Sequence, residues 1–171
     1  MRMNYQQWET TVPEEITGDS LWKMTAYRFA LFVSDLCWHD STKLIQDKRT
    51  QDLSNQLYRA TGSVGANIAE GYSRGTGRDR ARFYEYALGS ARESRDWYYK
   101  GRHVLGGSVI DHRLSLVTEI IRLLLTMIPQ QRDSAIREAA VEYHVESTGP
   151  ETDPALNSPE INPLLGDAPI P

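Results

Sequence analysis

The sequence has a single cysteine, Cys37, in 171 residues. One cysteine excludes an internal disulfide and every zinc or iron–sulfur site that is built from several cysteines. No apolar run approaches the ~18 residues that a membrane-spanning helix needs. Residues 1–15 also lack the apolar stretch of a secretory signal. These features predict a cytoplasmic protein with no membrane partner.

Motifs of known catalytic chemistry are missing as well. The sequence has no Glu-x-x-His pair for a di-iron site, no His-Glu-x-x-His and no Gly-x-Ser-x-Gly. Residues 71–78 are rich in glycine, but they follow a predicted helix instead of a strand and lack the Lys-Ser/Thr pair of a P-loop. We therefore expect no enzyme activity, no metal, no cofactor and no small-molecule substrate. The four histidines are expected near helix ends or on polar faces: His39, His103, His112 and His144.

Proline and negative charge gather at the end of the sequence. Six of the eight prolines lie within residues 150–171, and residues 145–171 contain five acidic residues but no Lys or Arg. This composition predicts a disordered acidic tail over residues 144–171. The whole chain has a net charge of −4 and the tail −5, which leaves +1 for residues 1–144.

The rest of the chain has the pattern of an all-α domain. Proline is absent between residues 14 and 128, and apolar residues recur every three or four positions. We predict four helices, over residues 19–38, 50–71, 76–105 and 108–128, in a domain of residues 19–143 that follows an N-terminal extension, 1–18. Gly71 is expected to cap the second helix and Pro129 to end or kink the fourth. The inner face of the third helix is predicted to contain Phe83, Ala87, Ser90, Ala91, Ser94 and Trp97.

The fourth helix has more apolar surface than one side of a bundle helix needs. Its apolar residues cover an arc of roughly 200°, whereas ~100–140° is enough for a helix on the outside of a monomeric bundle. Either residues 131–143 fold back over the surplus or a second subunit covers it, and we favour the second subunit. The predicted contacts of such an interface are Leu116, Ile120, Leu123 and Met127.

Basic residues are concentrated in the third helix. Residues 74–102 contain eight basic residues against four acidic ones. A solvated face with mixed ion pairs is the simpler interpretation. The alternative is a surface that binds nucleic acid or another anion, formed by Arg74, Arg78, Arg80, Arg82, Arg95 and Arg102.

The segment 53–93 carries a family resemblance. It contains Gln56-Leu57-x-Arg59-Ala60, then Ser63, Asn67-Ile68-Ala69-Glu70-Gly71-Tyr72, Arg74, Phe83, and Gly89-Ser90 with Glu93. In order and spacing this resembles the four-helix bundle protein family, also called 23S rRNA intervening-sequence proteins, whose early tryptophan matches Trp22. The resemblance covers most of residues 20–128.

The resemblance implies an up-down-up-down antiparallel four-helix bundle that assembles into a ring, typically a homopentamer, with no established enzymatic activity. Similar proteins, the accessory variability determinants of diversity-generating retroelements, use a basic ring surface to engage reverse transcriptase, RNA or DNA. The charge of +1 on residues 1–144 departs from that subgroup. A non-catalytic oligomeric scaffold is therefore the first functional hypothesis, and an accessory protein that binds nucleic acid or a reverse transcriptase is the second.

The motif residues are expected to have structural roles. Asn67 is predicted to fasten the loop after its helix, and Glu70 to form a salt bridge with Arg74 across the turn. The structural motif as a whole consists of Asn67, Glu70, Gly71, Arg74, Gly89 and Ser90.

Overall fold

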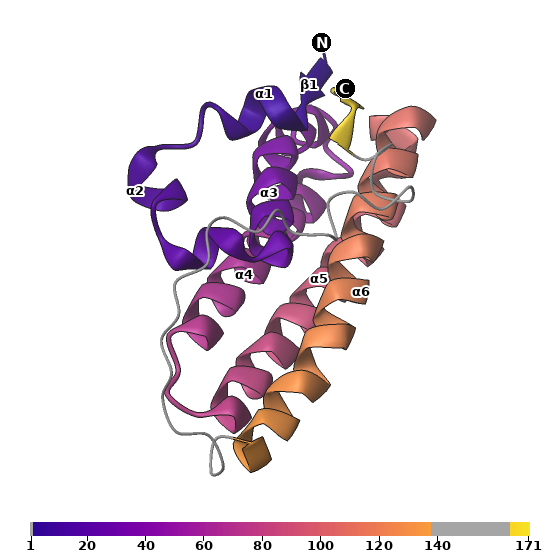
Figure 1. Ribbon diagram of the computed structural model, residues 1–171. Coiled ribbons are helices and arrows are strands. Elements are labelled where there is room, and N and C mark those ends of the chain that lie inside the picture. Colours follow the sequence, from indigo (N-terminus) through magenta and orange to yellow (C-terminus); the bar gives the residue numbers. More distant parts are fainter. Residues whose placement is uncertain (1, 138–164) are drawn as a thin grey trace.

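The computed structural model describes residues 2–137 and 165–171, and these residues are mostly helical (Figure 1). Four long helices form the body of the molecule: α3 (Thr25–Leu44), α4 (Gln51–Tyr72), α5 (Gly77–Leu105) and α6 (Gly107–Arg137). Three short helical segments precede them: α1 (Tyr5–Glu9), α2 (Glu14–Thr17) and the 3-10 helix η1 (Ser20–Lys23). Two strands, β1 (Arg2–Asn4) and β2 (Asp167–Pro169), form an antiparallel pair that the sequence did not predict.

The helix boundaries follow local capping and burial. Asp19 caps η1, because its carboxylate accepts the backbone N–H of Leu21 at 2.8 Å. Thr76 caps α5 in the same way, because its side chain accepts the backbone N–H of Asp79. The observed bounds of α4 and α5 lie within one residue of the predicted ones, which confirms them. The predicted first helix, 19–38, is wrong at both ends: α3 begins at Thr25, after η1, and it continues to Leu44, a fully buried residue that extends the apolar stripe of the helix.

Gly71 does not cap α4, contrary to the prediction. The helix continues to Tyr72, and the capping residue is Ser73. A Cβ at Gly71 would lie 2.7 and 2.8 Å from two ring atoms of Tyr84 and 3.0 Å from the Cβ of Phe83. The glycine is thus needed for the close approach of α4 to α5.

Pro129 does not end the fourth helix either. α6 includes it and continues to Arg137. A proline removes one backbone hydrogen bond, to the carbonyl four residues earlier, which here belongs to Leu125. Leu125 and Pro129 are both exposed, so water can donate to the carbonyl that the proline leaves unpaired.

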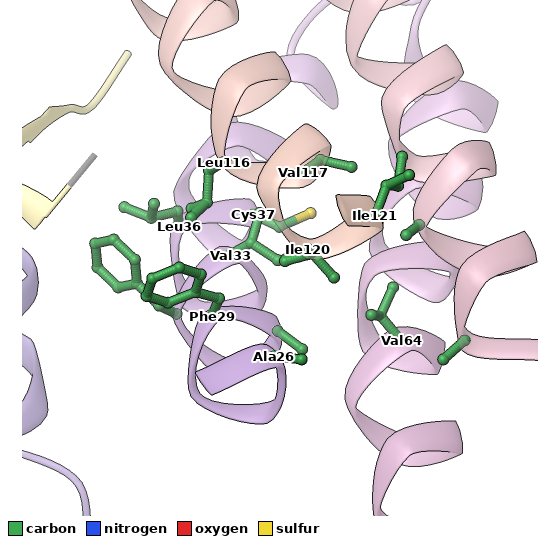
Figure 2. Packing of buried hydrophobic residues seen from close by; sticks show 14 of the residues in the cluster. Ala26, Phe29, Val33, Leu36, Cys37, Val64, Leu116, Val117, Ile120 and Ile121 are labelled. Atoms are coloured by element: carbon green, nitrogen blue, oxygen red, sulfur yellow. The ribbon is translucent and has the colours of Figure 1, made fainter. Parts of the chain in front are cut away.

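The core lies between α3, α4, α5 and α6, and Figure 2 shows part of it around α3 and α6. The inner face of α5 is shifted by one residue from the prediction: Ala87, Ala91 and Ser94 are buried as expected, whereas Phe83, Ser90 and Trp97 are only half-buried. Tyr84 and Tyr98 take the central positions instead. These two tyrosines supply the large side chains of a stripe that otherwise consists mainly of small residues.

One chain covers most of the apolar surface of α6. Within residues 107–132 eight apolar side chains are buried, and among the others only Leu125 and Pro129 are largely exposed. Residues 131–137 continue the helix, so they do not fold back over it. The remaining part of the predicted fold-back segment, residues 138–143, lies outside the described residues.

Both ends of the described chain pack onto the bundle. Tyr5 and Trp8 of the expected N-terminal extension are buried against Phe29 and Phe32 of α3. The indole N–H of Trp8 donates to Asp35 at 2.5 Å. The predicted disorder of the acidic tail is wrong for residues 165–171, because β2 pairs with β1 there, and residues 144–164 lie outside the described part. Within the described residues, no helix is long and apolar enough to cross a membrane.

Two buried tyrosine hydroxyls and a buried thiol make the free energy of unfolding depend on pH. Burial raises the pKa of the Tyr98 hydroxyl well above its ordinary value, and burial is also the main cause of the raised pKa values of the Cys37 thiol and the Tyr5 hydroxyl. Above about pH 9 the unfolded chain therefore loses these protons before the folded chain does. We expect urea titrations to give a free energy of unfolding that falls between about pH 8 and about pH 11. A constant value would contradict this burial.

Candidate functional site

The structure divides the four residues of the predicted subunit interface into two pairs. Leu116 and Ile120 have no exposed surface and face α3 in the core (Figure 2). They cannot contact a second subunit, so this part of the prediction is wrong. Leu123 and Met127 are half-buried and line a hollow of about 820 Å³ beside the start of α3. That hollow is also lined by Met24, Tyr72 and residues of α5.

The six arginines of the predicted anion-binding surface do not form one face. Arg80 donates to Gln131 at 2.7 Å and to the carbonyl of Arg74 at 3.1 Å, and Arg95 donates to Thr118 of α6 at 3.5 Å. Arg102 donates to the carbonyl of Tyr99 at 2.9 Å, and its guanidinium lies over that ring. These contacts hold the three side chains against the protein's own surface.

Arg78 and Arg82 are exposed and one turn apart on the outer side of α5. Together with Arg132 of α6 they line a hollow of about 940 Å³ that also contains Asp79 and Glu85. Arg132 forms an ion pair with Glu85. Three arginines thus line one hollow together with two carboxylates.

The motif residues have local structural roles, though not all of the predicted ones. The side chain of Asn67 donates to the carbonyl of Ser63 at 2.8 Å within α4, so it does not fasten the following loop. The carbonyl of Ser90 accepts from the hydroxyl of Ser94 at 2.8 Å within α5. Gly89 is exposed, and a Cβ there would meet no atom within 4 Å.

The expected salt bridge between Glu70 and Arg74 is present. It spans the end of α4, and the guanidinium of Arg74 also lies 4.4 Å from the ring centroid of Phe83. Both charged side chains are about half exposed. Exposed ion pairs contribute little to stability because water and salt screen them.

We expect Glu70→Ala to lower the free energy of unfolding by about 0.5 kcal/mol or less. The loss should shrink further in ~1 M salt, since the Debye length then falls to ~3 Å. Urea titrations at low and high salt measure both values. A loss above about 1.5 kcal/mol would show that the pair contributes more than an exposed contact does.

A buried polar cluster lies at the other end of the bundle, near β1 and β2. Asp40 of α3 and Arg113 of α6 have fully buried side chains and are joined by two hydrogen bonds, of 2.7 Å from Nε and 3.0 Å from Nη2. The hydroxyl of Tyr98 donates to the same carboxylate at 3.0 Å. Nη2 of Arg113 also donates to the carbonyl of Pro169 in β2 at 2.8 Å.

The opposite charges of Asp40 and Arg113 offset part of the free energy that burying each charge costs. Burial raises the pKa of Asp40, whereas the hydrogen bonds and charge of Arg113 and the hydrogen bond from Tyr98 lower it. We take the carboxylate as ionised at neutral pH, because protonation would leave Arg113 as an unpaired buried cation. The cluster joins α3, α5, α6 and β2, and it has the character of a structural cross-link.

The sequence interpretation missed this cluster, although a signal for it exists. Arg113 falls on the apolar stripe of α6, four residues after Val109 and seven before Ile120. Asp40 falls in the same way between Cys37 and Leu44 of α3. A charged residue on a buried stripe needs a partner on another helix, and the two charges are opposite.

The outer side of α3 and α4 exposes aromatic residues. Trp38 is 61% exposed and Tyr58 is 48% exposed, and their rings meet edge to face with centroids 6.2 Å apart. Ile45 lies two turns after Trp38 and is also exposed. Gly62 is one turn after Tyr58, and a Cβ there would meet no atom within 4 Å. We call Trp38, Ile45, Tyr58 and Gly62 the α3–α4 surface.

The comparison with known families identifies the chain. The sequence pattern of the family described as 23S rRNA-intervening sequence protein matches residues 23–134, well over half of the chain. The chain belongs to this family. The match confirms the resemblance drawn from residues 53–93. It includes α3, α4, α5 and most of α6, and it excludes β1, α1, α2 and β2.

A solved structure supports the fold of this family member. It is the crystal structure of a protein with unknown function from the S23 ribosomal protein family of Bacteroides thetaiotaomicron. The similarity has a TM-score of 0.57 and 22% identity, and it covers 61% of this chain and 98% of that one. No curated protein matches the sequence. Across residues 2–137 and 165–171, no three His, Cys, Asp or Glu side chains are grouped so that they could hold a metal ion.

Proposed function

We propose that this member of the 23S rRNA-intervening sequence protein family is a non-catalytic scaffold, an up-down helical bundle that assembles with further copies of itself into a ring. The observation that carries the proposal is the α3–α4 surface. Tryptophan and tyrosine are enriched in protein interfaces and supply much of their binding energy. Here a tryptophan and a tyrosine stand together in solvent with more than two fifths of each exposed.

The position of Gly62 also favours the α3–α4 surface as the place where another copy binds. A glycine inside an exposed stretch of helix costs about 1 kcal/mol relative to alanine. Gly65 on the same helix meets Ala30 and Leu31 of α3 at 3.7 and 3.8 Å, so packing within the chain accounts for it. Gly62 has no such neighbour, and close approach by a helix of another copy would account for it.

A ring requires two different surfaces on every copy, because its contacts run head to tail. The hollow lined by Met24, Leu123 and Met127 supplies the second one. Half of its lining residues are apolar or aromatic and the others are polar or charged, a mixture that suits an indole with its N–H, and its volume of about 820 Å³ leaves room for one. We therefore place Trp38 of one copy against this hollow of the next, which keeps Leu123 and Met127 of the predicted interface.

Complementation between two variants tests this arrangement by sedimentation velocity. Trp38→Ser removes one surface and Met127→Glu removes the other, so each variant alone should be monomeric. An equimolar mixture has one intact contact and should form dimers that grow no further. Tyr99→Ser removes an equally exposed aromatic residue of α5 and should assemble as the natural chain does. Assembly of Trp38→Ser to the natural size would contradict the proposal.

Nucleic-acid binding is the second candidate, and the hollow around Arg78, Arg82 and Arg132 is the observation that favours it. Phosphate neutralisation makes such binding depend on salt, and each arginine that no longer reaches a phosphate reduces the slope by about one. A mobility shift of labelled RNA at ~50 mM salt tests it. Arg78→Ala and Arg82→Ala should weaken binding and reduce the slope, whereas Arg49→Ala on the α3–α4 loop should not. Absence of a shift would eliminate this candidate.

A further inference from the structure

The segment Leu165–Pro171 lies beside β1 and α6, and we call the place that it fills the groove. Its strand β2 pairs with β1 in the register Arg2 to Pro169, Met3 to Ala168 and Asn4 to Asp167. Figure 1 shows the two strands side by side at one end of the molecule. Ala168 has no exposed surface. The groove thus accepts a small side chain at this position and has no room for a large one.

Side chains of the bundle add to the strand pairing. Arg113, which is held by Asp40, donates to the carbonyl of Pro169 at 2.8 Å. Ile170 lines a pocket of about 190 Å³ together with Trp8 and His39. Strand pairing, a fixed side-chain donor and pockets for alternate side chains are the elements by which proteins bind extended peptides at a sheet edge. The groove therefore favours a small residue at the position of Ala168 and an aliphatic residue two positions later, whereas Arg113 binds a backbone carbonyl and selects no side chain.

The connection to the rest of the chain is long. Residues 138–164, 27 in number, separate α6 from the segment. From Arg113 to the end of α6 the helix rises about 36 Å, whereas 27 residues can span at most ~90 Å. The segment therefore has the reach to enter the groove of its own chain or that of a neighbouring copy.

We propose that the groove is a peptide-binding site whose ligand is exchanged between copies: the segment Leu165–Pro171 of one chain binds beside β1 of another. Two of the elements that form the groove, β1 and α1, and the segment itself lie outside the region shared with the family, whereas Arg113 and His39 lie inside it. The exchange does not depend on assembly through the α3–α4 surface. It links copies through an extended strand instead of a helix face.

Cysteine cross-linking of two full-length variants tests the exchange. Met3 and Ala168 are directly opposed, and opposed residues of antiparallel strands have Cα atoms about 4.5–5.5 Å apart, within the range of a disulfide. Met3→Cys in one chain and Ala168→Cys in another cannot form this bond within either chain. After mixing and mild oxidation we expect a disulfide-linked heterodimer. Cys37 is fully buried and does not compete.

Two controls test whether the cross-link is specific and whether the strand register is correct. Asp167 is the neighbour of Ala168 on the opposite face of the strand, so Met3→Cys mixed with Asp167→Cys should give at least about tenfold less heterodimer. The double variant Met3→Cys/Ala168→Cys should close within one chain at high dilution, which verifies the register. Equal cross-linking of the two mixtures, or failure of the double variant to close, overturns the proposal.

A second pair leaves the buried alanine untouched, in case Ala168→Cys disturbs the fold. Asn4 and Asp167 are also direct partners, so Asn4→Cys mixed with Asp167→Cys should give the same heterodimer. The double variants Met3→Cys/Ala168→Cys and Asn4→Cys/Asp167→Cys report on pairing within one chain. If both close within single chains while neither mixture gives heterodimer at ~0.5 mM protein, the segment stays on its own chain. That result overturns the exchange, since a neighbour at near-millimolar concentration competes with a segment that is tethered through 27 residues.

Discussion

Arg113→Met is expected to lower the free energy of unfolding by about 3–5 kcal/mol, because it leaves a buried carboxylate without its cation. Asp40 would keep only the hydrogen bond from Tyr98, and the carbonyl of Pro169 would lose its donor. Methionine is close to arginine in length, so a change in packing contributes little. Urea titration of the full chain measures the loss.

Two further variants separate the ion pair from general sensitivity to substitution. Adding Asp40→Leu to Arg113→Met removes the unpaired charge, so the double variant should regain much of the stability. Arg49→Met breaks an ion pair with Asp47 on an exposed loop and should have no measurable effect. A loss below about 1 kcal/mol for Arg113→Met would mean that the cluster is open to water.

Gly71→Ala is expected to lower the free energy of unfolding by about 1–3 kcal/mol, although alanine is the better helix former. The added methyl group would lie 2.7 Å from the ring of Tyr84. That ring is 2% exposed and packed against α4, so the ring or the two helices must shift to admit the methyl group. This cost exceeds the gain in helix propensity of about 1 kcal/mol.

Gly89→Ala is the matched control for this substitution. It lies inside α5, and the new methyl group would meet no atom within 4 Å. Here only the propensity counts, and the free energy of unfolding should rise by about 0.5–1 kcal/mol. Thermal and urea unfolding of both variants give the two signs. A stabilised Gly71→Ala would contradict the close approach of the two helices.

The long helices could be predicted from the sequence because their signals are local. The absence of proline, the three-and-four spacing of apolar residues and the cap at Thr76 fix α4 and α5 to within one residue. The prediction for Pro129 failed because the free energy that a proline costs inside a helix depends on whether water reaches the preceding turn. That exposure is a property of the packed bundle and not of the local sequence. Gly71 was misjudged because a helix cap and a close helix contact both call for glycine.

The site was less predictable than the fold. The number of basic residues in 74–102 predicted one basic face. Helical spacing, however, puts Arg80 and Arg82 on different sides of α5. Arg80 contacts Gln131 of α6. Charged residues were assigned to the surface by default, which hid Asp40 and Arg113. The other helices of the same chain cover most of the apolar surface of α6 within residues 107–132, and local spacing does not reveal which element covers a helix face.

The mass of the full-length chain in solution tests the central claim most directly. Light scattering between about 5 and 200 μM spans the range in which interfaces of ordinary strength form. A scaffold that assembles through the α3–α4 surface should give a single species at a whole multiple of the 19.5 kDa chain. A mass of 19.5 kDa at every concentration would contradict the account, and the exposed Trp38 would then need another partner.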